Sequence, residues 1–112
     1  MTRPGSLKTF WALSDPVRLE ILERVAAGSE VTVSRLAAVL PITRQAVARH
    51  LKTLEESGLV TGSQKGREHR YDVDTGPLVD AGRWLRGRAA SWEDALGRLK
   101  LHVESDSGDG SL

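Results

Sequence analysis

Cysteine is absent from the chain, and this absence removes several classes of site together. Without thiols there is no disulfide, no thiolate-bound zinc or iron–sulfur cluster, and no cysteine nucleophile. Long hydrophobic runs are missing too. No stretch of about 18 apolar residues is present, and the N-terminal sequence lacks the apolar segment of a signal peptide. We therefore expect a soluble cytoplasmic protein with no membrane partner.

Motifs of catalysis are also missing. There is no glycine-rich phosphate loop, no local Ser-His-Asp motif and no acidic pair that indicates a catalytic cleft. The three histidines, His50, His69 and His102, are scattered and have no clustered carboxylates. The sequence thus predicts no enzyme, no metal site and no cofactor.

The charge of the chain is unevenly distributed. The 112 residues suffice for one domain, and their net charge is only +1. Residues 104–112 carry three acids and no base, which leaves a net charge of +4 on residues 1–103. We therefore divide the chain into a folded domain, 1–103, and an acidic disordered tail, 104–112. Residues 43–54 hold three bases and no acid, which is typical of a nucleic-acid contact, although a solvated helix face is the alternative.

Helical spacing and capping residues predict three helices in the first part of the chain. The first covers Leu7–Leu13, and the second follows the cap Asp15 and closes at Gly28. Thr32 caps a third helix that ends at Leu40, before a proline. The residues of this third helix that we expect to be buried are Leu36, Val39 and Leu40.

A fourth helix follows after a short turn. Thr43 can cap it, and Gly58 can stop it after Ser57. On a helical wheel its apolar face and its polar, mostly basic face lie opposite each other. The apolar face consists of Val47, Leu51 and Leu54, and the polar face of Gln45, Arg49, Lys52 and Glu56. Two helices joined in this way form a helix-turn-helix.

After Gly58 the helical spacing of apolar residues gives way to an alternation of apolar and polar residues. Two extended runs, 59–65 and 67–74, pivot about Lys65-Gly66 and predict a β-hairpin with a basic tip. His69 shares the parity of Tyr71 and Val73, which predicts partial burial of its ring, with a phosphate contact as the alternative. A hairpin directly after a helix-turn-helix is a wing, able to lie along the phosphate backbone or to reach the minor groove.

A last helix, from Leu78 to about Val103, carries an apolar repeat of seven. Leu78, Leu85, Trp92 and Leu99 form one line, with small and apolar residues on the neighbouring line. The alternative is a helix bent at Gly87 whose halves pack on their own domain. We favour a homodimer, with the first helix joining the seam. The expected interface residues are Phe10, Trp11, Leu85, Ala89, Trp92, Leu96, Leu99 and Val103.

Three strings of the sequence resemble one known family. The strings ALSDPVRLEILERV, TVSRLAAVLPITRQAVARHLKTLEESGLV and GREHRYDV are similar to the ArsR/SmtB family of bacterial winged-helix repressors, over residues 7–103. The resemblance implies a mostly helical α+β fold, a winged helix-turn-helix with a long C-terminal dimerisation helix. It also implies a homodimer that binds operator DNA and is released by an inducer or effector of unknown chemistry.

The metal sites of that family do not carry over to this chain. The segment 31–40, where many relatives hold a thiolate pair, has no cysteine. Another metal site of the family uses Asp and His ligands on the last helix. The only histidine there, His102, does not have the spacing of that site to Asp80 or Glu104. The chain therefore resembles the members of the family that do not sense metals.

The expected DNA contacts lie on the fourth helix and the hairpin. Arg44 and Gln45 begin the helix and can read base edges, whereas Arg49 and Lys52 are expected to hold phosphates. The complete set is Thr43, Arg44, Gln45, Arg49, Lys52, Lys65, Arg67 and Arg70. The sequence thus predicts a sequence-specific regulator of transcription, a homodimeric repressor on a palindromic double-stranded operator.

Two alternatives stay open. One is a winged-helix module that binds proteins and no DNA, which the basic face of the fourth helix disfavours. The other is an RNA-binding winged helix, which the lack of aromatic residues on the basic surfaces disfavours.

Overall fold

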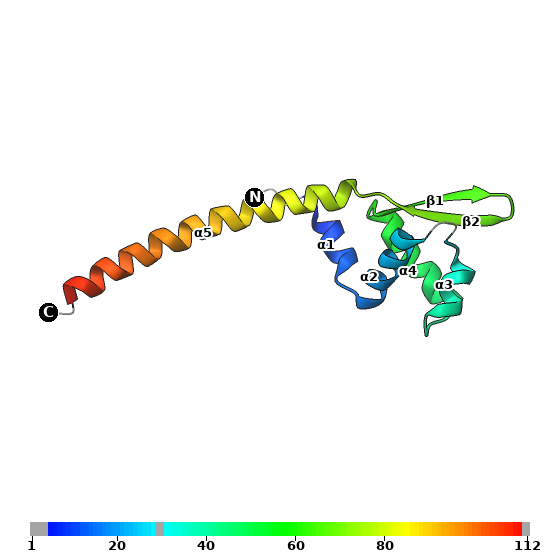
Figure 1. Ribbon diagram of the computed structural model, residues 1–112, viewed down its shortest axis with the longest axis horizontal. Helices are drawn as coiled ribbons and strands as arrows, with labels where there is room; N and C mark the ends of the chain where they lie inside the picture. Colours follow the sequence, from blue (N-terminus) through cyan, green and yellow to red (C-terminus); the bar gives the residue numbers. More distant parts are fainter. Residues whose placement is uncertain (1–4, 29–30, 111–112) are drawn as a thin grey trace. The chain divides into compact units, whose positions relative to one another are not determined.

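The computed structural model describes residues 5–28 and 31–110, with side-chain surroundings up to residue 103. It confirms a mostly helical α+β winged helix-turn-helix (Figure 1). The elements along the described residues are α1 (Leu7–Leu13), α2 (Pro16–Ala27), α3 (Val33–Val39), α4 (Arg44–Glu56), β1 (Val60–Lys65), β2 (Glu68–Val73) and α5 (Gly76–Gly110). The chain divides into two compact units, Met1–Ala81 and Gly82–Leu112. Across this part of the chain, no helix combines the length and apolar character needed to cross a membrane.

The predicted capping residues begin three of the helices. The Asp15 carboxylate accepts hydrogen bonds from the first backbone N–H groups of α2. The hydroxyls of Thr32 and Thr43 each accept one, at 3.1 Å, from the N–H of the third residue after them. These bonds satisfy N–H groups that have no partner inside a helix. The first unit therefore owes its helix boundaries to short-range signals in the sequence.

The end of α4 is fixed by a glycine in a left-handed conformation. Gly58 has φ +78°, and its N–H donates to the carbonyl of Glu55 at 2.9 Å. The N–H of Leu59 donates to the carbonyl of Leu54, also at 2.9 Å. This pair of bonds is a Schellman motif, which reverses the chain and delivers Leu59 into the core. The wing therefore starts at a fixed angle from α4.

The core of the first unit is built around the apolar face of α4. Its largest fully buried side chains are Ile21, Val47, Leu51, Leu54 and Leu59. The predicted apolar face of α4 is thereby confirmed.

The expected burial of Val39 is wrong. Val39 is 57% exposed, while Leu36 is buried and Leu40 packs against the core. The helix ends at Val39, and the extended backbone of Leu40 turns that side chain to the core instead. Within the helix, Leu36 is buried and Val33 and Ala37 pack against the core, so Val39 lies off this face.

The hairpin pairs as predicted, with its turn one residue later. Val60 faces Val73 at the base and Lys65 faces Glu68 at the tip. The two turn residues are therefore Gly66, with φ +63°, and Arg67. A further bridge joins Tyr71 to Val31, whose carbonyl accepts from the Tyr71 N–H at 3.2 Å. This bridge attaches the wing to the strand-like segment before α3.

A buried arginine joins α1 to α2. Arg18 donates from Nε to the carbonyl of Ala12 at 2.8 Å and from Nη2 to that of Trp11 at 3.1 Å. Its guanidinium lies 4.8 Å from the centre of the Trp11 ring and 3.6 Å from the Asp15 carboxylate. The last carbonyls of α1 thus find donors on the next helix.

Helix α5 continues without a break through Gly87 and past Val103 to Gly110. Its first turn belongs to the first unit, where Leu78 packs against the core and Ala81 is buried. Leu78 is therefore a core residue and does not begin the apolar seam.

In the second unit, every described side chain from Leu85 to Val103 is exposed. The disordered tail 104–112 stays a prediction, because the side chains of 104–110 and the whole of residues 111–112 lie outside the described part.

Candidate nucleic-acid interface

The N-terminal end of α4 presents its first side chains to solvent. The Thr43 hydroxyl caps the helix, so Arg44 and Gln45 occupy its first turn, and all three are exposed. Backbone N–H groups and the positive end of the helix dipole lie at the same end. This end of α4 therefore favours a negatively charged partner.

The basic face of α4 continues along the helix. Arg49 and Lys52 are exposed on the side opposite the buried Val47, Leu51 and Leu54. No acidic residue occurs in α4 before Glu55. The predicted contacts on this helix thus form one exposed strip that is free of carboxylates.

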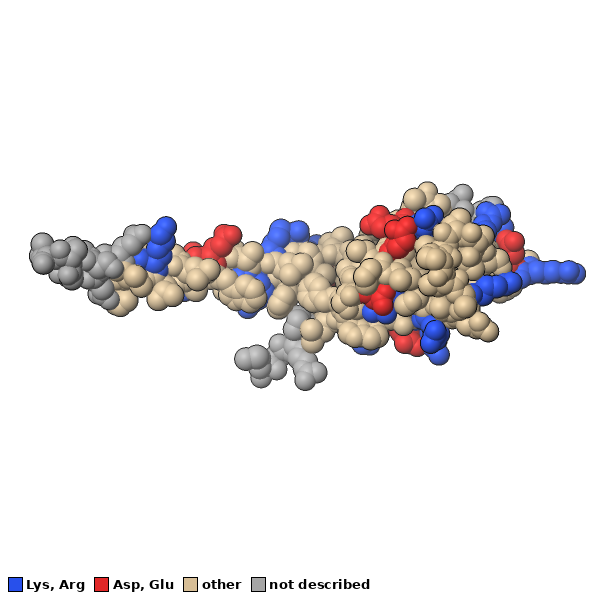
Figure 2. Space-filling view, turned by 90° about the horizontal axis from the view of Figure 1, so that it is seen from below, with Lys and Arg blue, Asp and Glu red and all other residues tan. Residues whose placement is uncertain are grey.

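The wing places its basic residues unequally. Lys65 and Arg67 are exposed at the tip, whereas the Arg70 side chain is 26% exposed and lies 3.4 Å from a Glu68 carboxylate oxygen. Figure 2 shows basic side chains gathered at the hairpin end of the first unit, with acidic ones among them. Lys65 and Arg67 are therefore better placed than Arg70 to meet a phosphate backbone.

The wing contacts the C-terminal part of α4 through a residue of β2. Nε2 of His69 lies 3.9 Å from Oε1 of Glu55, and the centres of the His69 and Tyr71 rings lie 4.9 Å apart with the ring planes tilted by 41°. His69 is exposed, so the predicted partial burial is wrong. A Cβ at position 62 would collide with both the Glu55 and His69 side chains. Burial raises the pKa of the Tyr71 hydroxyl, and the nearby Glu55 charge adds to the rise.

A hollow of about 230 Å³ separates the start of α4 from the wing. We call it the wing hollow; it is lined by Thr32, Val33, Ser34, Arg44, Arg67, Glu68 and His69. It brings together Arg44 and Arg67, two predicted contacts that are far apart in the sequence. Ser34 was not predicted as part of the site, because only the folded chain places it beside these arginines. His69, for which a phosphate contact was the alternative to burial, also lines the hollow. Gln45, the neighbour of Arg44, does not line it.

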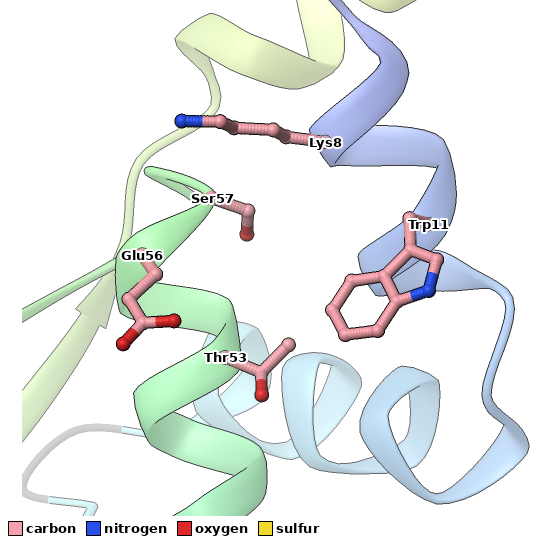
Figure 3. A pocket seen from close by; sticks show the side chains of 5 residues that line it. All are labelled: Lys8, Trp11, Thr53, Glu56 and Ser57. Atoms are coloured by element: carbon pink, nitrogen blue, oxygen red, sulfur yellow. The ribbon is translucent and has the colours of Figure 1, made fainter.

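A second hollow of about 230 Å³ lies at the other end of α4, against α1. Lys8, Trp11, Thr53, Glu56 and Ser57 line it (Figure 3). Trp11 remains 62% exposed even though Arg18 covers part of its ring. Figure 3 shows the indole at one side of the hollow, facing α4.

The predicted dimer residues fall into two groups. Phe10 is half-buried and Trp11 exposed, both on α1. The six on α5, which are Leu85, Ala89, Trp92, Leu96, Leu99 and Val103, are all exposed.

Among the residues that the structure describes, no three His, Asp or Glu side chains gather as a group that could hold a metal ion.

Relatives of known sequence share the helix-turn-helix region. The family described as "Helix-turn-helix domain" matches residues 13–63. The HTH-type transcriptional regulator YuzN of Bacillus subtilis is 42% identical over 75 residues, which cover 62% of this chain and 82% of that protein. The arsenical resistance operon repressor of Staphylococcus xylosus is 34% identical over 62 residues, which cover 55% of this chain and 59% of that repressor.

A solved structure extends the similarity beyond this region. The ArsR-like transcriptional regulator from Rhodococcus sp. RHA1 matches with a TM-score of 0.77 and 38% identity, covering 86% of this chain and 90% of that one. Sequence and fold therefore agree, and the chain belongs to the ArsR family of helix-turn-helix transcriptional regulators.

Proposed function

We propose that the chain represses transcription as a homodimer bound to a two-fold-related operator in double-stranded DNA. The observation that carries the proposal is α4, whose buried apolar face holds it in the core while its exposed face is basic along the first three turns. Recognition helices of this kind enter the major groove with their N-terminal residues toward the bases. The name of the Staphylococcus xylosus relative, an operon repressor, favours repression.

The proposed DNA-binding residues divide by the type of contact. Gln45 reads base edges from the first turn of α4, and Arg49 and Lys52 hold phosphates farther along the helix. Lys65 and Arg67 at the wing tip bind the backbone, and Thr43 and Arg70 lie at the margins of this surface. No step of this function requires catalysis or a metal ion.

The second part of the proposal is the homodimer. An isolated helix is marginally stable in water, yet α5 exposes Trp92, Leu96 and Leu99. Exposed apolar rows of this length mark interaction surfaces. The lines of seven on α5 fit a second copy of the same helix, as in a coiled coil. We propose that Phe10 and Trp11 of α1 also lie in this interface, which gives the exposed indole a cover.

A mobility-shift experiment tests DNA binding. The DNA upstream of the chain's own gene, a random duplex and an RNA of equal length would be compared at one stated salt concentration. We expect the upstream duplex to bind at least about 10³-fold more tightly than the random duplex. Equal or tighter binding of the RNA would favour the RNA-binding alternative. Absence of binding to all three would favour the protein-interaction module.

A further inference from the structure

The path of a DNA strand past this fold is constrained by geometry. With α4 in the major groove and the wing against the neighbouring backbone or minor groove, one sugar-phosphate strand has to pass between them. The wing hollow lies in this position, with Arg44 on the α4 side and Arg67 on the wing side. A strand that passes here meets a lining to which α4 contributes Arg44 and the wing contributes Arg67.

The chemistry of the wing hollow suits a phosphate. Guanidinium groups bind phosphate oxygens through paired, charge-assisted hydrogen bonds. The Ser34 hydroxyl and the His69 imidazole add further donors at its edge. The one carboxylate among its lining residues, Glu68, has an oxygen 3.4 Å from Nη2 of Arg70, which offsets its charge.

We infer that the wing hollow holds one backbone phosphate of the DNA, bound jointly by Arg44 and Arg67. The inference rests on the proposed function and revises the role of one residue. Arg44 positions the protein on the backbone, whereas the sequence assigned it to base edges. Base reading at the start of α4 then falls to Gln45, whose side chain does not line the hollow.

Salt-dependent binding of single variants separates the two roles of Arg44. Arg44→Ala and Arg67→Ala should each weaken binding to a selected operator and to random duplex by the same factor. Because the proposed homodimer carries two copies of each arginine, each variant should also make the slope of log K against log salt shallower by about 1.8, which is about 0.9 for one phosphate contact in each half-site. Gln45→Ala, as the matched control, should lose affinity for the operator only and keep the slope.

The double variant tests whether the two arginines share one phosphate. Arg44→Ala/Arg67→Ala should lose less affinity than the product of the two single losses, because either loss already disrupts the shared contact. Replacing single phosphates by neutral methylphosphonates should reveal one position in each half-site at which the wild type loses affinity and the double variant does not. Arg24→Ala, on α2, serves as a control for removal of an exposed charge. Circular dichroism melts verify that each variant is folded.

Several outcomes would overturn the inference. If Arg44→Ala weakened operator binding while leaving random duplex and the salt slope unchanged, Arg44 would be a base contact. Fully multiplicative losses, or two separate methylphosphonate positions within one half-site, would assign the arginines to different phosphates. If wild-type protein bound no DNA at all, the proposed function itself would fail, which these variants do not test.

Discussion

Asp15 shows how a single cap links stability to pH. The hydrogen bond from the Arg18 backbone N–H is the largest cause that lowers the pKa of Asp15, against a partial opposing effect of burial. The Val17 N–H and the charges of Arg18 and His50 lower this pKa further. A carboxyl with a lowered pKa in the folded state stabilises the fold above its unfolded pKa of about 3.9, and this contribution is lost as the pH falls through the folded pKa.

We expect Asp15→Asn to weaken this pH dependence. The amide still caps α2 but carries no charge, so the melting temperature at pH 7 should fall modestly. When the pH is lowered from 7 to 3, the melting temperature of the wild type should fall by more than that of the variant. Thermal unfolding followed by circular dichroism measures both. Parallel curves for the two proteins would show that the Asp15 charge contributes nothing to stability.

Arg18 is the residue whose role depends most on its partners in the neighbouring helix. Its Nε and Nη2 bind two carbonyls at the end of α1, which an ammonium group on a lysine cannot reach with the same geometry. Arg18→Lys should therefore lower the free energy of unfolding by about 1.5–3 kcal/mol, the range for a hydrogen bond to a charged group. The control is Arg24→Lys, because Arg24 forms an exposed ion pair with Glu20, four residues earlier on the same helix. This change should alter the free energy of unfolding by less than about 0.5 kcal/mol. Urea denaturation of both variants measures the difference, and equal effects would contradict the anchoring role.

At the scale of elements, α4 makes the largest contribution to the core. Leu54 is fully buried, and its truncation removes apolar contacts and leaves a cavity. Leu54→Ala should cost about 2–5 kcal/mol of unfolding free energy. Leu19→Ala on α2, where the side chain is 43% exposed, is the matched control and should cost far less. Similar losses in chemical denaturation would show that the core is not centred on α4.

The elements themselves could largely be predicted from sequence, because their signals are local. Asp15, Thr32 and Thr43 bind N–H groups two or three residues away, and Gly58 needs only its own backbone conformation. Burial at the end of α3 could not be predicted in this way. Whether Val39 or Leu40 reaches the core depends on the backbone of the residue after the helix.

The wing hollow shows the same limit for the candidate site. Its two arginines could be proposed individually from their positions on a helix and at a hairpin tip. Their approach to each other depends on the start of α3, on the turn before α4 and on the Val31–Tyr71 bridge, which are tertiary features. The register of the hairpin, which determines that Arg67 is a turn residue, also decides which side chains face α4.

At the scale of the whole molecule, the proposed tight operator binding requires the proposed homodimer. One winged helix covers one half-site, and its few contacts would leave affinity near the nonspecific range of about 10⁻⁴–10⁻⁶ M. Two copies joined through α5 would present two recognition helices to a two-fold-related site. Trp92 is 59% exposed in the single chain and is the largest side chain on the predicted seam. We therefore expect Trp92→Ala to weaken the dimer by about 3–5 kcal/mol, if the partner buries it fully.

A charge on the seam should separate assembly from folding more sharply. Leu96→Asp places a carboxylate in the proposed interface, whereas Leu101→Asp places it on the opposite side of α5, about 200° from Leu99 by helical geometry. Both leucines are exposed in the single chain, at 63% and 68%, so neither change should unfold the first unit. Sedimentation at micromolar concentration should give a dimer for the wild type and Leu101→Asp, and a monomer for Leu96→Asp. Because Leu96→Asp should not dimerise, it should also lose tight operator binding, although its α4 is unchanged. A monomeric wild type, or two variants that behave alike, would refute the seam and require another partner for the apolar side of α5.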